Sequence, residues 1–147
     1  MSLWWVAGIA LFMLIILGSK NKKPKQQHTP IHAKAILTRR EQQFFAVLEQ
    51  ALPRFYIFPQ VSFSAILTTK GFYTRSQFNR KIADFVLCNE GLEIIAVIEL
   101  DDSSHKGREK QDAARDAMLD EAGYPVLRYA QIPESWQLQK DIRQLIK

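Results

Sequence analysis

The sequence has a single cysteine, Cys88, among its 147 residues. One thiol cannot form an internal disulfide, so a small disulfide-stapled scaffold is excluded and a reducing compartment is expected. Six glycines and six prolines are too few for a collagen-like or low-complexity chain. A chain of this length, with 47% hydrophobic residues, is expected to form at most one compact soluble domain.

Acidic residues are missing from the N-terminal part of the chain. Residues 19–40 carry seven Lys and Arg and no acid, and the other thirteen basic residues accompany all 15 acids in residues 41–147. Residues 41–147 therefore have a net charge of about −2, although the whole chain carries +5. The excess positive charge belongs to a short segment and is no argument that the folded domain binds nucleic acid.

Charges of either sign are absent from the sixteen residues Leu3–Gly18. A helix of that length rises about 24 Å, slightly less than the hydrocarbon core of a bilayer. Trp4 and Trp5 at one headgroup region and Lys20 at the other extend the usable span. We expect residues 1–19 to be a transmembrane anchor, with the N-terminus outside and the soluble domain in the cytoplasm, as the positive-inside rule predicts.

Two alternatives to the anchor are a cleaved signal peptide and a buried core helix. No Lys or Arg precedes the apolar run and no A-x-A-like site follows it, which disfavours a signal peptide. The run begins at the extreme N-terminus and has no polar face, which disfavours a core helix.

A basic segment, residues 20–36, follows the apolar run. It mixes Lys, Gln and Pro without apolar periodicity, which predicts a flexible linker. Its first lysines, at positions 20, 22, 23 and 25, are expected to contact anionic lipid headgroups. The soluble domain is predicted to span residues 37–147.

Capping and periodicity predict an α/β domain in the order α-β-β-β-α-β-α. Thr38 and Glu41 fit a capping box at the start of the first helix, and Gly123 fits the end of a later one. Residues 64–79 are expected to form a short helical turn and an exposed loop. Helices are predicted over 39–51, 106–122 and 133–146, and strands over 55–63, 81–88, 92–100 and 124–129.

Carboxylates recur where the predicted strands end. Asp84 lies among apolar residues of one strand, and Glu99 and Asp101 share one face at the end of the next. A buried carboxylate needs a compensating positive charge. A divalent cation held by Asp84, Glu99 and the Leu100 carbonyl meets this need, since Mg²⁺ and Mn²⁺ prefer hard oxygen ligands. A salt-bridge cluster with Arg80, Lys81 or Arg115 is the alternative.

Asp84, a hairpin, and then Glu99-Leu100-Asp101 followed by His105 resemble the PD-(D/E)xK core of restriction-endonuclease-like nucleases. The stretches IELDDSSH and GYPVLRY resemble the small branch that includes very-short-patch-repair-like endonucleases. TRREQQFFAVLEQAL and FNRKIADFVLC resemble a bacterial domain family of unknown function whose members often carry an N-terminal membrane anchor. The resemblance implies a restriction-endonuclease-like α-β-β-β-α-β core with a C-terminal helix, at the bacterial inner membrane.

The resemblance also implies roles for single residues. Asp84, Glu99 and Glu41 match the family's ligands for a catalytic Mg²⁺ or Mn²⁺, although Glu41 also fits a simple helix cap. Asp101 stands where the family has a lysine that activates the attacking water, so catalysis requires another group. Lys81 or Arg115 is a candidate replacement for the lysine, and His105 a candidate general base or acid.

The basic residues Lys70, Arg75, Arg80 and Lys81 form an acid-free stretch interleaved with aromatics, which is typical of nucleic-acid contacts. A solvated basic loop is the alternative. These features predict a membrane-anchored, metal-dependent nuclease that hydrolyses phosphodiester bonds of DNA or RNA. A catalytically inactive module of the same fold, which binds nucleic acid, metal or a protein partner, is the second hypothesis.

Overall fold

The computed structural model describes residues 28–101 and 109–146. The chain divides into two compact units, residues 1–33 and 34–147. The predicted anchor over residues 1–19 lies outside the described residues, as do residues 20–27 of the predicted linker over 20–36. Residues 28–36 of the linker form no helix or strand. Within the described ranges, no helix has the length and apolar character needed to cross a membrane.

The first described helix, α2 (Arg39–Ala51), starts at the predicted capping box. The Glu41 amide donates to Oγ1 of Thr38 at 3.3 Å, and the Thr38 amide donates to Oε2 of Glu41 at 2.6 Å. Both bonds satisfy amides that lack partners within the helix. The helix ends before Pro53, as predicted, and its buried residues include Phe44 and Leu48.

Three strands then form an antiparallel meander: β1 (Tyr56–Ser62), β2 (Ile82–Cys88) and β3 (Ile94–Leu100). β1 lies at one edge of the sheet, a position where a proline such as Pro59 is tolerated. β3 is buried at nearly every position, because helices cover both faces of the sheet.

The last strand, β4 (Val126–Tyr129), pairs with β3 in parallel after the crossover helix α5 (Glu109–Glu121). Gly123 follows α5 with a φ of +80°, the left-handed conformation predicted for the end of this helix. The C-terminal helix α6 (Ser135–Leu145) then packs against α2. Apart from two short helices between β1 and β2, the elements follow the predicted order, and the mixed sheet has the strand order β1-β2-β3-β4.

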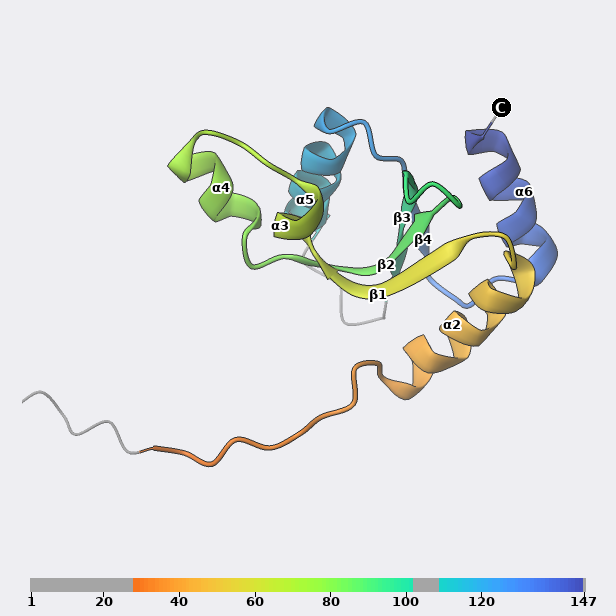
Figure 1. The fold of residues 1–147 in the computed structure, drawn as a ribbon, viewed down its shortest axis with the longest axis horizontal. Coiled ribbons are helices and arrows are strands. Elements are labelled where there is room, and N and C mark those ends of the chain that lie inside the picture. Colours follow the sequence, from red (N-terminus) through yellow and green to blue (C-terminus); the bar gives the residue numbers. More distant parts are fainter. Residues whose placement is uncertain (1–27, 102–108, 147) are drawn as a thin grey trace, which may run out of the picture. The chain divides into compact units, whose positions relative to one another are not determined.

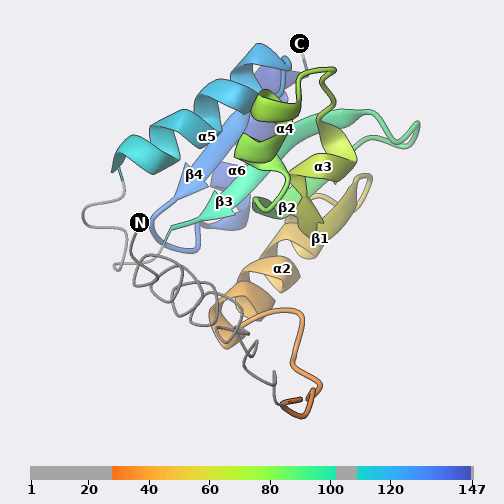
Figure 2. The same cartoon turned by 90° about the vertical axis from the view of Figure 1, so that its left-hand side faces the viewer.

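Helices form a layer on each face of the sheet (Figure 1). α2 and α6 cover one face through Phe44, Leu48, Leu138 and Ile142. α3 (Phe63–Ile66), α4 (Phe72–Phe78) and α5 lie on the other face (Figure 2). Their buried residues Phe63, Phe78 and Leu119 pack against Ala83, Val86, Cys88 and Val97.

The prediction for residues 64–79 was incomplete. The structure has two short helices there, α3 and α4, where the sequence predicted one helical turn and a loop. Phe78, near the end of this stretch, is 3% exposed and packs α4 against the sheet. Burial of this ring stabilises α4, although the polar residues of the helix give no helical pattern in the sequence.

Candidate functional site: carboxylates at the end of β2 and β3

Asp84 and Glu99 lie side by side on neighbouring strands. Phe85 pairs with Ile98 in the β2–β3 register, so one further residue places Asp84 opposite Glu99. Side chains of directly opposed residues share a face and stand about 5 Å apart at Cβ. Val86 and Val97 pack in the core on the α5 side. Alternation along each strand therefore places both carboxylates on that side.

The Asp84 carboxylate is partly buried, and its Oδ2 accepts a hydrogen bond from the Leu100 amide at 2.9 Å. Burial raises the pKa of Asp84 above its ordinary value. The Leu100 amide and Arg115 oppose this shift, whereas the negative charges of Glu41 and Asp101 add to it. Negative charge on Asp84, the residue predicted as the first metal ligand, is therefore destabilised by its surroundings.

Glu99 is 3% exposed and is the one charged residue in the described part of the chain that is fully buried. Burial raises its pKa from 4.5 to about 7, and the nearby Asp84 carboxylate adds to this effect. Arg115 and Arg128 oppose the shift. The NH2 of Arg115 forms an ion pair with Oε1 of Glu99 at 2.7 Å.

Arg115 extends from α5 to the end of the sheet. The same NH2 that pairs with Glu99 donates to the Ile82 carbonyl at 2.9 Å, and the guanidinium lies 5.4 Å from the centre of the Phe63 ring. Its Nε is buried and has no hydrogen-bond partner among the described residues. The sequence suggested Arg115 both as a replacement for the family lysine and as a salt-bridge partner. The structure places it in contact with Glu99.

Asp101 belongs to an ion-pair network that the sequence did not predict. Its Oδ1 accepts from NH1 of Arg128 at 2.7 Å. Arg128 also binds both carboxylate oxygens of Asp116, at 2.9 and 2.7 Å. These bonds raise the pKa of Arg128 further, so the guanidinium stays charged.

The β3–β4 register places Arg128 next to Glu99, which is why one guanidinium influences both carboxylates. The Arg40 side chain adds bonds to the carbonyls of Asp101 at 2.9 Å and Ala130 at 2.6 Å. Parallel pairing across a crossover helix brings Arg128 to this place. No spacing in the sequence reveals that pairing, although the GYPVLRY stretch contains the arginine.

Glu41, on α2, influences the site electrostatically. Both of its oxygens are in use, since Oε2 accepts from Thr38 and Oε1 accepts from Nε2 of Gln60 at 3.4 Å. Its charge still helps to raise the pKa of Asp84. The residue therefore closes the capping box and faces the site electrostatically. In residues 28–101 and 109–146, no group of three or more His, Cys, Asp or Glu side chains has the geometry of a metal site.

The remaining predicted site residues are spread out. The Lys81 side chain makes no hydrogen bond or ion pair with any residue that the structure describes. Lys70, Arg75 and Arg80 are exposed on and around α4. His105 lies in residues 102–108, outside the described ranges.

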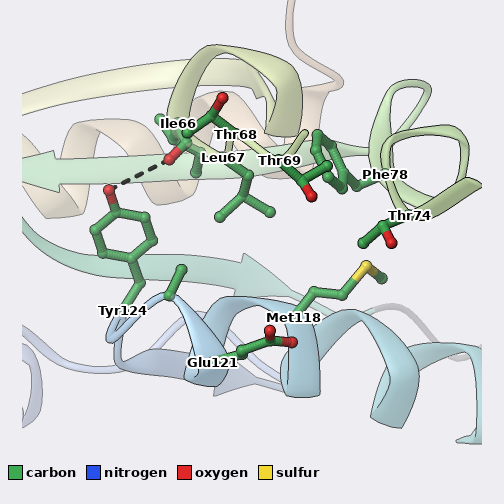
Figure 3. Close-up of a pocket in the computed structure, with 10 residues that line it drawn as sticks. Ile66, Leu67, Thr68, Thr69, Thr74, Phe78, Met118, Glu121 and Tyr124 are labelled. Atoms are coloured by element: carbon green, nitrogen blue, oxygen red, sulfur yellow. Dashed lines mark hydrogen bonds between the residues drawn. The ribbon is translucent and has the colours of Figure 1, made fainter. Parts of the chain in front are cut away.

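A separate cavity of about 310 Å³ lies between the α3–α4 segment and α5 (Figure 3). Leu67, Phe78 and Met118 give it an apolar lining, and Thr74 and Glu121 add polar groups. Tyr124 donates a hydrogen bond from its hydroxyl to the Ile66 carbonyl at 3.3 Å beside it. None of the residues predicted for the acidic site lines this cavity.

The fold and the site define a mixed α/β domain with a buried and a partly buried carboxylate side by side at one end of its sheet. The profile of the family described as "Protein of unknown function (DUF2726)" matches residues 33–146, and the chain belongs to this family. Neither a curated protein nor a solved structure matches the chain. The resemblance to an uncharacterised domain family is thereby confirmed, whereas the nuclease assignment stays a prediction.

Proposed function

We propose that this protein is a membrane-anchored, metal-dependent nuclease that hydrolyses phosphodiester bonds in DNA or RNA at the cytoplasmic face. The observation that carries the proposal is the pair Asp84 and Glu99, opposed on neighbouring strands and both driven toward protonation by burial. Buried carboxylates with raised pKa values are a frequent feature of functional sites. The helix, three-stranded meander, crossover helix and parallel strand agree with the core that the nuclease resemblance implies.

The donor set at this end of the sheet fits Mg²⁺ or Mn²⁺. Asp84 uses Oδ2 for the Leu100 amide and Glu99 uses Oε1 for Arg115, so each carboxylate keeps a second oxygen for a cation. Mg²⁺ retains several waters and needs only one or two protein carboxylates. Glu41 adds negative charge close to Asp84. A cation in this place relieves the repulsion among these groups.

A divalent cation, when bound, stabilises negative charge on a phosphate and acidifies a water for in-line attack. Asp84 and Glu99 would hold the cation, and would thereby position the substrate relative to the sheet. Arg115, released from Glu99, presents a guanidinium to the phosphate and takes over charge stabilisation from the family's lysine. Asp101 holds Arg128 in place and does not replace that lysine, because a carboxylate has no positive charge to offer.

A non-hydrolytic binding module is the second candidate. The two ion pairs Arg115–Glu99 and Arg128–Asp101 favour it, because each arginine already neutralises a carboxylate of the site. In this case the acidic site is structural or binds a ligand without turnover, and the fold is retained without the chemistry.

Cleavage and thermal stability separate the two candidates. The full-length protein in mild detergent is incubated with Mg²⁺ or Mn²⁺ and a panel of single- and double-stranded DNA and RNA. The nuclease proposal expects cleavage, together with a metal-dependent rise in melting temperature, and both are lost in Asp84→Asn and Glu99→Gln. Asp120→Asn on the exposed face of α5 is the matched control and keeps both. A metal-dependent stabilisation without cleavage supports the second candidate, and no response to metal rejects the metal site.

A further inference from the structure

A long stretch of the folded domain contains no acid. Residues 50–83 hold five basic residues and neither Asp nor Glu. Three of the basic residues, Lys70, Arg75 and Arg80, are exposed on and beside α4. Their side chains make no hydrogen bond or ion pair with the described part of the chain. This surface therefore presents to solvent a positive charge that no ion pair with a described residue neutralises.

Two large aromatic side chains lie within the same surface. Phe72 is 89% exposed and Tyr73 is 76% exposed, whereas Phe78 of the same helix is 3% exposed. One buried ring is sufficient to attach α4 to the sheet. The two exposed rings add nothing to the core and are available to an external ligand.

A cavity lies beside α4, which contributes Thr74 and Phe78 to its lining (Figure 3). Its volume of about 310 Å³ exceeds that of a single nucleobase. Leu67, Phe78 and Met118 suit a flat apolar face, and Thr74 and Glu121 suit polar base edges. The Glu121 carboxylate repels phosphate, so a base is a better occupant of the cavity than a phosphate group.

We propose that the α4 surface, defined as Lys70, Phe72, Tyr73, Arg75 and Arg80, binds single-stranded nucleic acid. Phe72 and Tyr73 stack on unpaired bases, the three basic residues contact phosphates, and the neighbouring cavity accepts a base turned out of the strand. The inference rests on the proposed nuclease function and deepens it by naming single strands as the substrate class. A duplex is a poor ligand because its base faces are covered by stacking.

A lipid surface fits the α4 surface less well than a nucleic acid does. Interfacial helices bury a continuous apolar face in the membrane. α4 has only seven residues, and one of its three aromatic side chains, Phe78, is buried in the protein. Its other exposed residues are polar or charged: Thr74, Arg75, Ser76 and Gln77. Two adjacent rings among polar residues are suited to base stacking.

The stacking contribution is measured by fluorescence anisotropy of the full-length protein in mild detergent with EDTA, so that no cleavage occurs. Three ligands of equal length are compared: a single-stranded 12-mer, its duplex, and a 12-mer in which the central bases are abasic. We expect the single strand to bind at least tenfold more tightly than the other two. The double variant Phe72→Ala/Tyr73→Ala loses at least tenfold in affinity for the single strand and little in affinity for the abasic strand, since only the single strand has bases to stack on the two rings.

The control for the aromatic variant is Trp136→Ala, because Trp136 is 61% exposed on α6, at the opposite end of the domain from α4 (Figure 1). It leaves single-strand binding unchanged. For the charges, Lys70→Glu/Arg75→Glu makes the negative slope of log affinity against log salt about 1.4 less steep, as expected for two lost contacts with a single strand. Lys140→Glu, also exposed on α6, does not change the slope.

Equal binding of single strand, duplex and abasic strand overturns the inference, as does an aromatic variant with unchanged affinity. Loss of binding to anionic phospholipid vesicles in that variant, with oligonucleotide affinity unchanged, assigns the surface to lipid and also overturns it. The proposed function fails separately, since it is judged by cleavage and its loss in Asp84→Asn. Single-strand binding without cleavage supports the inference and rejects the nuclease.

Discussion

At the scale of single residues, Glu99 concentrates the electrostatics of the site. Its carboxylate is buried with one ion-pair partner, Arg115, and with Asp84 opposite. The sequence predicted that the carboxylates of the two strands need a positive charge. Arg115 supplies one in the structure, and a cation is proposed to replace it during function. The pKa of Glu99 is about 7 because Arg115 offsets only part of the effect of burial.

We predict that Glu99 makes the metal-free protein less stable as the pH rises. The unfolded chain releases the Glu99 proton near pH 4.5, and the folded protein keeps it up to about pH 7. The folded state therefore binds more protons in this window, and the free energy of unfolding falls by about 3 kcal/mol across it. Urea unfolding in EDTA between pH 4 and 8 measures this slope. Glu99→Gln is expected to lack this part of the slope, and an unchanged profile in the variant contradicts the assignment.

Arg115→Met is predicted to destabilise the fold by about 3 kcal/mol at pH 8, because it leaves a buried carboxylate without its partner. The double variant Glu99→Gln/Arg115→Met is expected to lose less than the sum of the single variants, since the buried charge is then also removed. Arg75→Met, at an exposed arginine, serves as control and changes stability by less than about 0.5 kcal/mol. Strictly additive losses, measured by urea unfolding, contradict a direct coupling of Glu99 and Arg115.

At the scale of elements, local signals predicted some boundaries well and others poorly. The capping box and Pro53 defined α2 from Arg39 to Ala51, because its ends depend on neighbours in the sequence. The helix α4 was not predicted, because it depends on Phe78 reaching the core and its own residues give no periodic pattern. The strands begin one or two residues later than predicted, which reflects pairing partners rather than local preference.

The capping box provides a direct test at this scale. Thr38→Ala removes the acceptor for the Glu41 amide, and we predict a loss of about 1 kcal/mol in the free energy of unfolding. Thr29→Ala, in exposed coil outside any helix, is the matched control and is expected to be neutral. Thermal or urea unfolding of both variants provides the measurement. Equal effects at the two positions contradict a capping role for Thr38.

At the scale of the whole molecule, the proposal joins a folded domain to an N-terminal anchor. The anchor and the lipid contacts of the lysines after it stay predictions from the sequence, because residues 1–27 lie outside the described part of the chain. The domain carries the family match and the candidate site. The proposed tethering by the first segment and the proposed catalysis by the second can therefore be tested separately.

Deletion of residues 1–19 is predicted to release the protein from the membrane. The full-length chain is expected to stay in the membrane fraction at high salt and to require detergent, because a spanning helix is not held by charge. The shortened chain is expected in the soluble fraction, with its melting temperature close to that of the full-length protein. Fractionation followed by thermal unfolding measures both. Recovery of the full-length chain in the soluble fraction without detergent rejects the anchor.

The sequence by itself determined the order of the four strands and the three longer helices, the start of α2 and the presence of Asp84 and Glu99 on adjacent strands. These features follow from local spacing, capping and alternation, which act over a few residues. Tertiary structure alone decided that Arg115 lies against Glu99, that Arg128 bridges Asp101 and Asp116, and that Phe72 and Tyr73 stay outside the core. These contacts join residues brought together by the crossover between β3 and β4 or by the packing of α4, and such long-range placement depends on how the whole chain buries its apolar surface.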